Sequence, residues 1–176
     1  ATCTVRYRVG EVAFTRTTFS SFPDQVLVQR IEADQKGKVG FVLRVGSPHA
    51  ASIGRALDTN TLQLAGHVRD DGVRFALQVR AVAQGGTVAT TDNAITVEGA
   101  EAVTLLVSAA TSFVNFRDIS GDPEAKAGAF LAAAATRDAA TLLERHQQDH
   151  RRLFRRVTID LGTSPVAARP TDERIA

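Results

Sequence analysis

The chain has 176 residues, of which 44% are apolar and 23% are charged. This balance is ordinary for a globular domain and excludes a largely disordered chain. The net charge is only +2, which is too small to predict a nucleic-acid partner unless the positive charge is focused on one surface. The length suits one domain with a short addition.

The positive charge is concentrated at residues 145–156, which contain five arginines; the only acidic residues in or next to this stretch are Glu144 and Asp149. A solvated helix face explains this cluster, so no nucleic-acid partner is expected. No uninterrupted apolar run is long enough to predict a membrane span. The single cysteine, Cys3, cannot form an internal disulfide, and its position predicts a half-buried strand residue.

Residues 5–107 follow a period of two or form short apolar runs, and glycine, asparagine and aspartate turns separate them. Val5, Tyr7 and Val9 alternate with arginines, which indicates a strand with one wet face. Asp70-Asp71-Gly72 and Gly85-Gly86 are strong turn signals, and residues 46–60 have the character of a loop. We expect strands at residues 1–9, 12–19, 25–33, 39–45, 61–66, 73–83, 87–89, 94–97 and 103–109. Nine or ten short strands without an intervening helix predict an antiparallel β-sandwich.

After residue 121 the apolar period changes to about 3.6. Asp122 is a good N-cap and Pro123 suits the first helical position, which predicts a helix over residues 123–135. Asp138 caps a second predicted helix that reaches to about residue 155. The inward stripe expected on that helix is Leu142, Leu143, His146, His150, Leu153 and Phe154. Alternation at residues 157–161 then predicts that the chain re-enters a sheet as one more strand of the same domain.

The expected organisation has three segments. Residues 1–121 form the β-sandwich, residues 122–161 add two helices and the return strand, and residues 162–176 are a linker. A strand at the first residue and a helix start at residues 170–176 suggest a piece of something larger, so the sandwich is expected to be the C-terminal part of a larger one. We therefore expect open sheet edges, which favour association of the isolated chain.

Few residues have a pattern that predicts chemistry. His146 and His150 have the i, i+4 spacing of a metal pair, but Gln147 stands where a metalloprotease has glutamate, and no third ligand is evident. Packing at a seam explains the two histidines, so neither a metal nor a cofactor is expected. Asp70 and Asp71 are explained by their turn, because adjacent turn residues cannot face each other across a cleft. The residues therefore predict no catalytic site.

One segment between a strand end and a helix start has the composition of a recognition loop. Its polar residues suit sugar hydroxyls, and its two phenyl rings could stack on a ligand. The alternative is that the same side chains brace the strand-to-helix crossing or an interdomain seam. The candidates for contact with a substrate or a neighbouring domain are Phe113, Asn115, Phe116, Arg117 and Asp118, next to Thr111 and Ser112.

Short phrases that occur in order along nearly the whole chain resemble a known family. They are Val5-Arg6-Tyr7, Phe22-Pro23-Asp24-Gln25-Val26-Leu27-Val28, Ser47-Pro48-His49, Ala110-Thr111-Ser112-Phe113-Val114-Asn115-Phe116-Arg117-Asp118 with Gly121-Asp122-Pro123, Leu153-Phe154-Arg155-Arg156-Val157 with Leu161-Gly162, and Pro170-Thr171-Asp172-Glu173-Arg174. As a set they resemble the N-terminal β-domain of glycoside hydrolase family 95, whose best-known activity is α-L-fucosidase.

The resemblance implies a larger enzyme, with a β-sandwich, a helical linker, an (α/α)6 catalytic barrel and a C-terminal β-domain. Its inverting hydrolysis of terminal α-L-fucosyl linkages takes place in the barrel, so no catalytic residue is carried over to this chain. The implied partners are the chain's own barrel and an oligo- or polysaccharide substrate. The family also implies a secreted, periplasmic or cell-surface protein of bacteria, although no signal-peptide pattern is seen in this chain.

Two alternatives stay open at this point. A free-standing carbohydrate-binding or adhesion module would also have a β-sandwich and a recognition loop. A phosphorylase with a similar N-terminal sandwich is a further possibility.

Overall fold

The computed structural model describes residues 2–49, 51–160 and 162–175. Within these ranges the chain forms ten strands followed by helices, as predicted. The strands are β1 (Cys3–Val9), β2 (Val12–Ser21), β3 (Val26–Ala33), β4 (Val39–Arg44), β5 (Ile53–Ala56), β6 (Thr61–His67), β7 (Arg74–Gln84), β8 (Thr87–Thr91), β9 (Ala94–Ala100) and β10 (Ala102–Thr111). The helices are α1 (Pro123–Ala135), α2 (Ala139–Phe154), the 3-10 helix η1 (Pro165–Ala168) and α3 (Thr171–Ile175).

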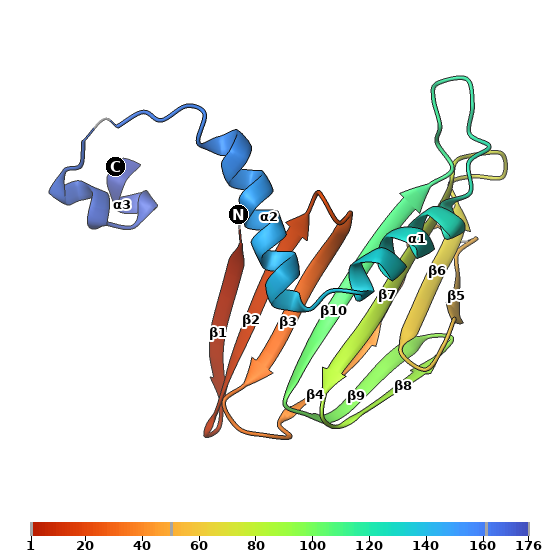
Figure 1. Ribbon diagram of the computed structural model, residues 1–176, viewed down its shortest axis with the longest axis horizontal. Helices are drawn as coiled ribbons and strands as arrows, with labels where there is room; N and C mark the ends of the chain where they lie inside the picture. The colour runs from red at the N-terminus through yellow and green to blue at the C-terminus, as the bar shows by residue number, and fades with distance from the viewer. Residues whose placement is uncertain (1, 50, 161, 176) are drawn as a thin grey trace.

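The strands form two antiparallel sheets, which confirms the predicted sandwich. The large sheet has seven strands in the order β1-β2-β3-β10-β7-β6-β5, and the small sheet has the order β4-β9-β8. Helices α1 and α2 lie across one face of the large sheet, while the small sheet lies behind it (Figure 1). The large sheet is therefore the middle of three layers.

Each face of the large sheet has its own core. Between the sheets, Val103 and Leu105 of β10 pack with residues of the small sheet such as Ile95. On the helical face, Leu106 packs with Leu131 of α1 and Leu142 of α2. Because both faces of β10 are covered, its sequence is a nearly continuous apolar run and does not alternate with polar residues.

The chain changes sheets at the predicted Gly85-Gly86 turn. Both glycines have positive φ, 71° and 67°, and the turn takes the chain from β7 in the large sheet to β8 in the small one. A Cβ atom at Gly86 would lie against the carbonyl oxygen of Glu98 and 2.6 Å from the backbone nitrogen of Ala100. The close approach and the left-handed backbone together require glycine here.

The predicted N-caps begin both long helices. The Asp122 carboxylate accepts a hydrogen bond from the Ala125 backbone N–H at 3.0 Å, and that of Asp138 accepts one from Thr141 at 2.7 Å. Hydrogen bonds from the Thr141 backbone and hydroxyl lower the pKa of the Asp138 carboxyl. The predicted α1 bounds of residues 123–135 are confirmed, and the second helix is confirmed with its last residue at Phe154.

The inward stripe predicted on α2 is only partly correct. Leu142 and His146 are buried, but Leu153 is 50% exposed and Phe154 is 73% exposed. The reason is that α2 packs on β2 through its first turns, and its last turns extend past the strand ends (Figure 1).

Three other predictions differ from the structure. The predicted loop at residues 46–60 contains the edge strand β5, which has only four residues. The return strand predicted at residues 157–161 is wrong for residues 157–160, which have no regular structure and are exposed because α2 carries them away from any sheet edge; Leu161 lies outside the described residues. Cys3 is exposed and not half-buried, because β1 is itself an edge strand.

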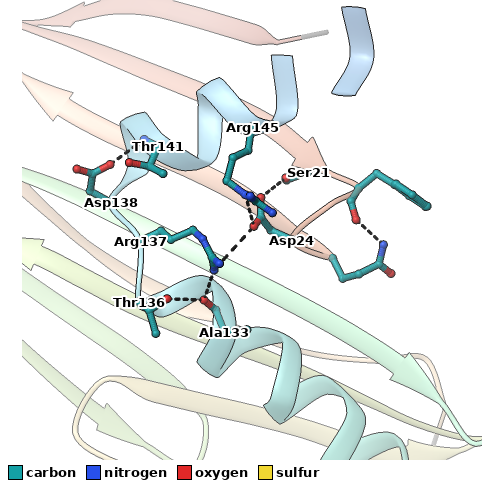
Figure 2. Close-up of polar contacts among 10 residues, drawn as sticks. Ser21, Asp24, Ala133, Thr136, Arg137, Asp138, Thr141 and Arg145 are labelled. Atoms are coloured by element: carbon teal, nitrogen blue, oxygen red, sulfur yellow. Dashed lines mark hydrogen bonds and ion pairs between the residues drawn. The ribbon is translucent and has the colours of Figure 1, made fainter. Parts of the chain in front are cut away.

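A buried carboxylate joins the β2–β3 turn to the helices (Figure 2). The Asp24 side chain is 2% exposed, and Ser21 Oγ donates a hydrogen bond to its Oδ2 at 2.7 Å. Arg145 of α2 donates from Nε to Asp24 Oδ1 at 2.9 Å, and Arg137, between the helices, lies 4.0 Å from the same oxygen. Two guanidinium groups and a hydroxyl therefore compensate the charge that burial removes from water.

Arg145→Ala should lower the free energy of unfolding by about 1–3 kcal/mol, because it leaves the buried Asp24 carboxylate without its nearest charged donor. Arg151→Ala is the matched control, since Arg151 is an exposed arginine of the same helix. Urea unfolding of the two variants measures the difference. Equal unfolding free energies would contradict this role of Asp24.

Candidate functional site

The candidate recognition segment is a hairpin between β10 and α1. The backbone N–H of Asn115 donates to the Asp118 carbonyl oxygen at 3.1 Å, and the N–H of Asp118 donates back at 3.0 Å. Phe116 and Arg117 are therefore the two residues at its tip. We call residues 113–120 the tip hairpin; it projects beyond the ends of the strands (Figure 1).

The base of the tip hairpin is fastened to β7. The Ser112 hydroxyl is buried and accepts a hydrogen bond from the Arg74 backbone N–H at 2.9 Å. The Arg74 guanidinium donates to the Gly121 carbonyl oxygen at 2.7 Å. These bonds hold both ends of the hairpin, so it leaves the sheet at a defined place.

Two of the five candidate residues use their side chains inside the hairpin. Asn115 Oδ1 accepts a hydrogen bond from the Arg117 backbone N–H at 2.9 Å, and Asp118 Oδ1 accepts one from Ser120 at 2.8 Å. Hydrogen bonds from the Ser120 hydroxyl and backbone N–H lower the pKa of the Asp118 carboxyl. For Asn115 and Asp118 these contacts favour the bracing role over direct recognition.

The other three candidates point outward. Phe113 is 53% exposed and Phe116 is 83% exposed, and the Arg117 guanidinium carbon lies 4.9 Å from the centre of the Phe116 ring. The cation–π contact orients the ring and leaves most of it exposed. With Val114 and Ile119, which are also exposed, the two phenyl rings give the hairpin an apolar surface.

A groove of about 590 Å³ lies at the same end of the sandwich. Strand register places Phe75 of β7 beside Thr111 of β10, and His49 lies with its ring 5.6 Å from that of Phe75. Lys126 of α1 also lines the groove. Sequence reasoning missed Phe75 and Lys126, because strand pairing brings Phe75, and packing of α1 on β7 and β10 brings Lys126, near the Ser47-Pro48-His49 loop.

A second cavity, of about 510 Å³, lies beside the start of α1 and is lined by both polar and apolar side chains. Gln63 donates to the Glu124 carboxylate at 2.7 Å, and Gln78 donates to Gln63 at 2.8 Å. Arg55 lies 3.5 Å from the same carboxylate. Among the described residues, no buried side-chain nitrogen or oxygen lacks a hydrogen-bond partner. These contacts explain the polar side chains of the cavity as part of the packing between the sheet and α1.

The histidine pair on α2 is part of a packed seam. The His146 ring is buried and stacks on Phe19 with 5.3 Å between ring centres, and the His150 ring is 6.3 Å from that of His146. Residues 2–49, 51–160 and 162–175 contain no group of three histidine, cysteine, aspartate or glutamate side chains that could hold a metal ion. In the same ranges, no helix is both long and apolar enough to cross a membrane.

The fold is that of a β-sandwich domain with a helical extension. Its exposed candidate surface is formed by loop residues. Residues 1–116 match the family described as glycosyl hydrolase family 65, N-terminal domain, and the chain belongs to this family.

Two comparisons extend this assignment. Alpha-L-fucosidase 2 of Arabidopsis thaliana is 29% identical over 195 residues, which cover 93% of this chain and 23% of that protein. A solved structure described as a kojibiose phosphorylase from the human microbiome has a TM-score of 0.60 and 14% identity, over 87% of this chain and 23% of that one. The structural likeness shows the fold alone. The chain is thus similar to an N-terminal domain of a glycoside hydrolase and spans less than a quarter of each relative.

The pKa of Asp118 predicts how the tip hairpin responds to pH. Because the folded-state pKa is lowered, the carboxylate's stabilising contribution is present above the unfolded-state value of about 3.9 and is lost as the pH falls through the folded-state pKa. Asp118→Ala should therefore reduce amide-exchange protection of Asn115 and Ser120 at neutral pH, and the wild-type and variant hairpins should become alike below that range.

Protection factors measured by NMR, which correct for the intrinsic exchange rate at each pH, test this expectation. Asp71→Ala in the β6–β7 turn is the control and should leave the tip hairpin unchanged. Equal protection of Asp118→Ala and wild type at neutral pH would show that the Ser120 contact does not hold the hairpin.

Proposed function

We propose that the full-length protein is an α-L-fucosidase-type glycoside hydrolase of the kind found in family 95, and that this chain is a non-catalytic part of its N-terminal β-domain. The observation that carries the proposal is the similarity to Alpha-L-fucosidase 2, which extends over 93% of the chain. The similarity thus exceeds the 116 residues of the family match and includes residues of the helical extension. The proposed reaction is hydrolysis of terminal α-L-fucosyl linkages with inversion.

The roles of the acidic side chains support a non-catalytic chain. Inverting hydrolysis needs two carboxyl groups about 6.5–9.5 Å apart across a cleft that admits the sugar. Next to the cavities, Glu124 pairs with Gln63 and Arg55, and Asp122 caps α1. Asp118 braces the tip hairpin. Each of these three carboxylates thus has a structural partner, so we assign the chemistry to the rest of the enzyme.

For the tip hairpin we propose contact with the (α/α)6 catalytic barrel at the rim of its cleft. An exposed phenyl ring such as Phe116, held by Arg117 on a braced turn, suits either a barrel surface or the ring of an oligo- or polysaccharide substrate. An extracytoplasmic location is part of the same proposal, since a polymeric substrate is met outside the cell.

A second candidate function is phosphorolysis. One observation favours it: the fold is similar to that of a structure described as a kojibiose phosphorylase. Both candidates cleave a glycosidic bond and differ in whether water or phosphate receives the sugar.

The two candidates give different products from the full-length protein. We expect free fucose from an α-L-fucosyl oligosaccharide in phosphate-free buffer, with no increase on adding phosphate. The 176-residue chain should release none, because the carboxyl groups for inversion lie outside it. Chromatography of the products measures both. A sugar 1-phosphate that forms only with phosphate would establish the phosphorylase, and turnover by the 176-residue chain would contradict the non-catalytic assignment.

A further inference from the structure

The small sheet covers only part of the large sheet. Its main contacts are with β3, β5, β6 and β7, and its edge strand β4 makes the contact with β3. Strands β1 and β2 lie beyond that edge, and helix α2 packs against β2 from the other side (Figure 1). Among the described residues, one face of β1 and β2 is therefore left without a covering layer.

Most side chains on this face are apolar. Strand register places Tyr7 beside Phe14, and the two rings stack with 5.3 Å between their centres. Val5 and Val9 flank Tyr7 on the same face and are 50% and 63% exposed. Arg16 pairs with Val5, and its guanidinium carbon lies 5.1 Å from the centre of the Tyr7 ring. We call Val5, Tyr7, Val9, Phe14 and Arg16 the open face.

The hydrophobic core between the two sheets continues up to the open face. Phe14 of β2 and Phe41 and Leu43 of β4 pack against the buried cluster between the sheets, but all three are only half-buried. Ile95 of β9, the next strand of the small sheet, is fully buried. A further layer over the open face would remove the three half-buried side chains from water, which is favourable.

The edge of β4 indicates what kind of segment forms that layer. Within the described residues β4 pairs only with β9, so alternate backbone N–H and C=O groups of β4 point away from β9. Edge strands commonly carry charges or proline that prevent pairing, and the edge strand β1 has Arg6 and Arg8. Residues 39–43 of β4 contain neither a charge nor a proline. A strand that paired with β4 would continue the small sheet towards β2 and β1.

We propose that the open face and the free edge of β4 bind a β-strand from a part of the same polypeptide outside these 176 residues. Backbone hydrogen bonds join this strand to β4, and its alternate, inward-facing residues are apolar to match Tyr7 and Phe14. The chain spans 23% of each of its two relatives, so a protein of their size has the chain length to supply the strand. The proposal rests on the proposed function only in that this chain belongs to a longer polypeptide.

A second copy of this chain does not fit the same place. A copy that continued the small sheet from β4, with its apolar side towards the open face, would bring its own large sheet into the space of β1 and β2. A copy turned over would place exposed outer side chains of its small sheet, such as Arg44 and Glu98, against Phe14 and Tyr7. A strand of the same polypeptide avoids both conflicts and is held at a high local concentration.

Thiol labelling of the full-length protein tests whether the open face is covered. Arg16→Cys places a thiol on the open face, and Arg6→Cys is the matched control, because Arg6 is an exposed arginine on the opposite face of the neighbouring strand. Peptide mass spectrometry gives the labelling rate at each position and separates it from that of Cys3. We expect labelling at position 16 to be at least about tenfold slower than at position 6, as for a site that must open before it reacts, and the two rates to become equal in urea.

Hydrogen exchange of residues 39–44 in the full-length wild type tests whether the covering segment is a strand. We expect every β4 amide to be protected, including those that point away from β9, because the added strand accepts their hydrogen bonds. Fast exchange of these outward amides would overturn the proposal even if position 16 is covered.

Labelling at position 16 that is as fast as at position 6 would also overturn the proposal. So would labelling that is slow only at high protein concentration, which would identify a second copy, or only after an oligosaccharide is added, which would identify a sugar-binding face. Absence of fucosidase activity in the wild type would reject the proposed function and leave both measurements valid.

Discussion

The burial of Asp24 is the constraint on which the arrangement of sheet and helices depends. A carboxylate removed from water must be matched by donors, and here they come from α2, from the connection between the two helices and from the β2–β3 turn. The hydrogen bond between Arg145 and Asp24 depends on distance and direction, so it adds a directional constraint to the apolar packing of the helices. The helices are thereby placed across one face of the large sheet, and the exposed end of α2 follows from that placement.

The two faces of the large sheet are stabilised by different means. Towards the small sheet the contacts are apolar, and Ile95 and Val103 are fully buried. Towards α1 several contacts are polar: the Ser108 hydroxyl donates to the Ala127 carbonyl oxygen at 2.8 Å, and the Gln78 amide lies against Gly128. Small side chains on α1 let its backbone come close to the sheet. This close packing explains why the helix is rich in alanine.

Much of the fold followed from local chemistry. Asp122 and Asp138 predicted both helix starts because an N-cap is a contact within four residues, and alternation predicted most strands. The order of the strands, the edge strand β5 and the exposure of Phe154 depend on distant partners that no local pattern encodes. The candidate site shows the same division. Its position between strand and helix was predicted, whereas the bracing roles of Asn115 and Asp118 arise from a hairpin whose pairing only the three-dimensional structure reveals.

The place of β10 in the large sheet has a consequence for how the protein is made. This strand lies between β3 and β7, and its residue Val107 pairs with Leu27, which is eighty positions earlier in the chain. During synthesis on the ribosome, β3 and β7 therefore emerge well before the strand that joins them, and each presents an unpaired edge until β10 arrives. Closing so long a loop is slow compared with forming a hairpin. The nascent sandwich thus passes through an interval in which its central strands are open to other chains.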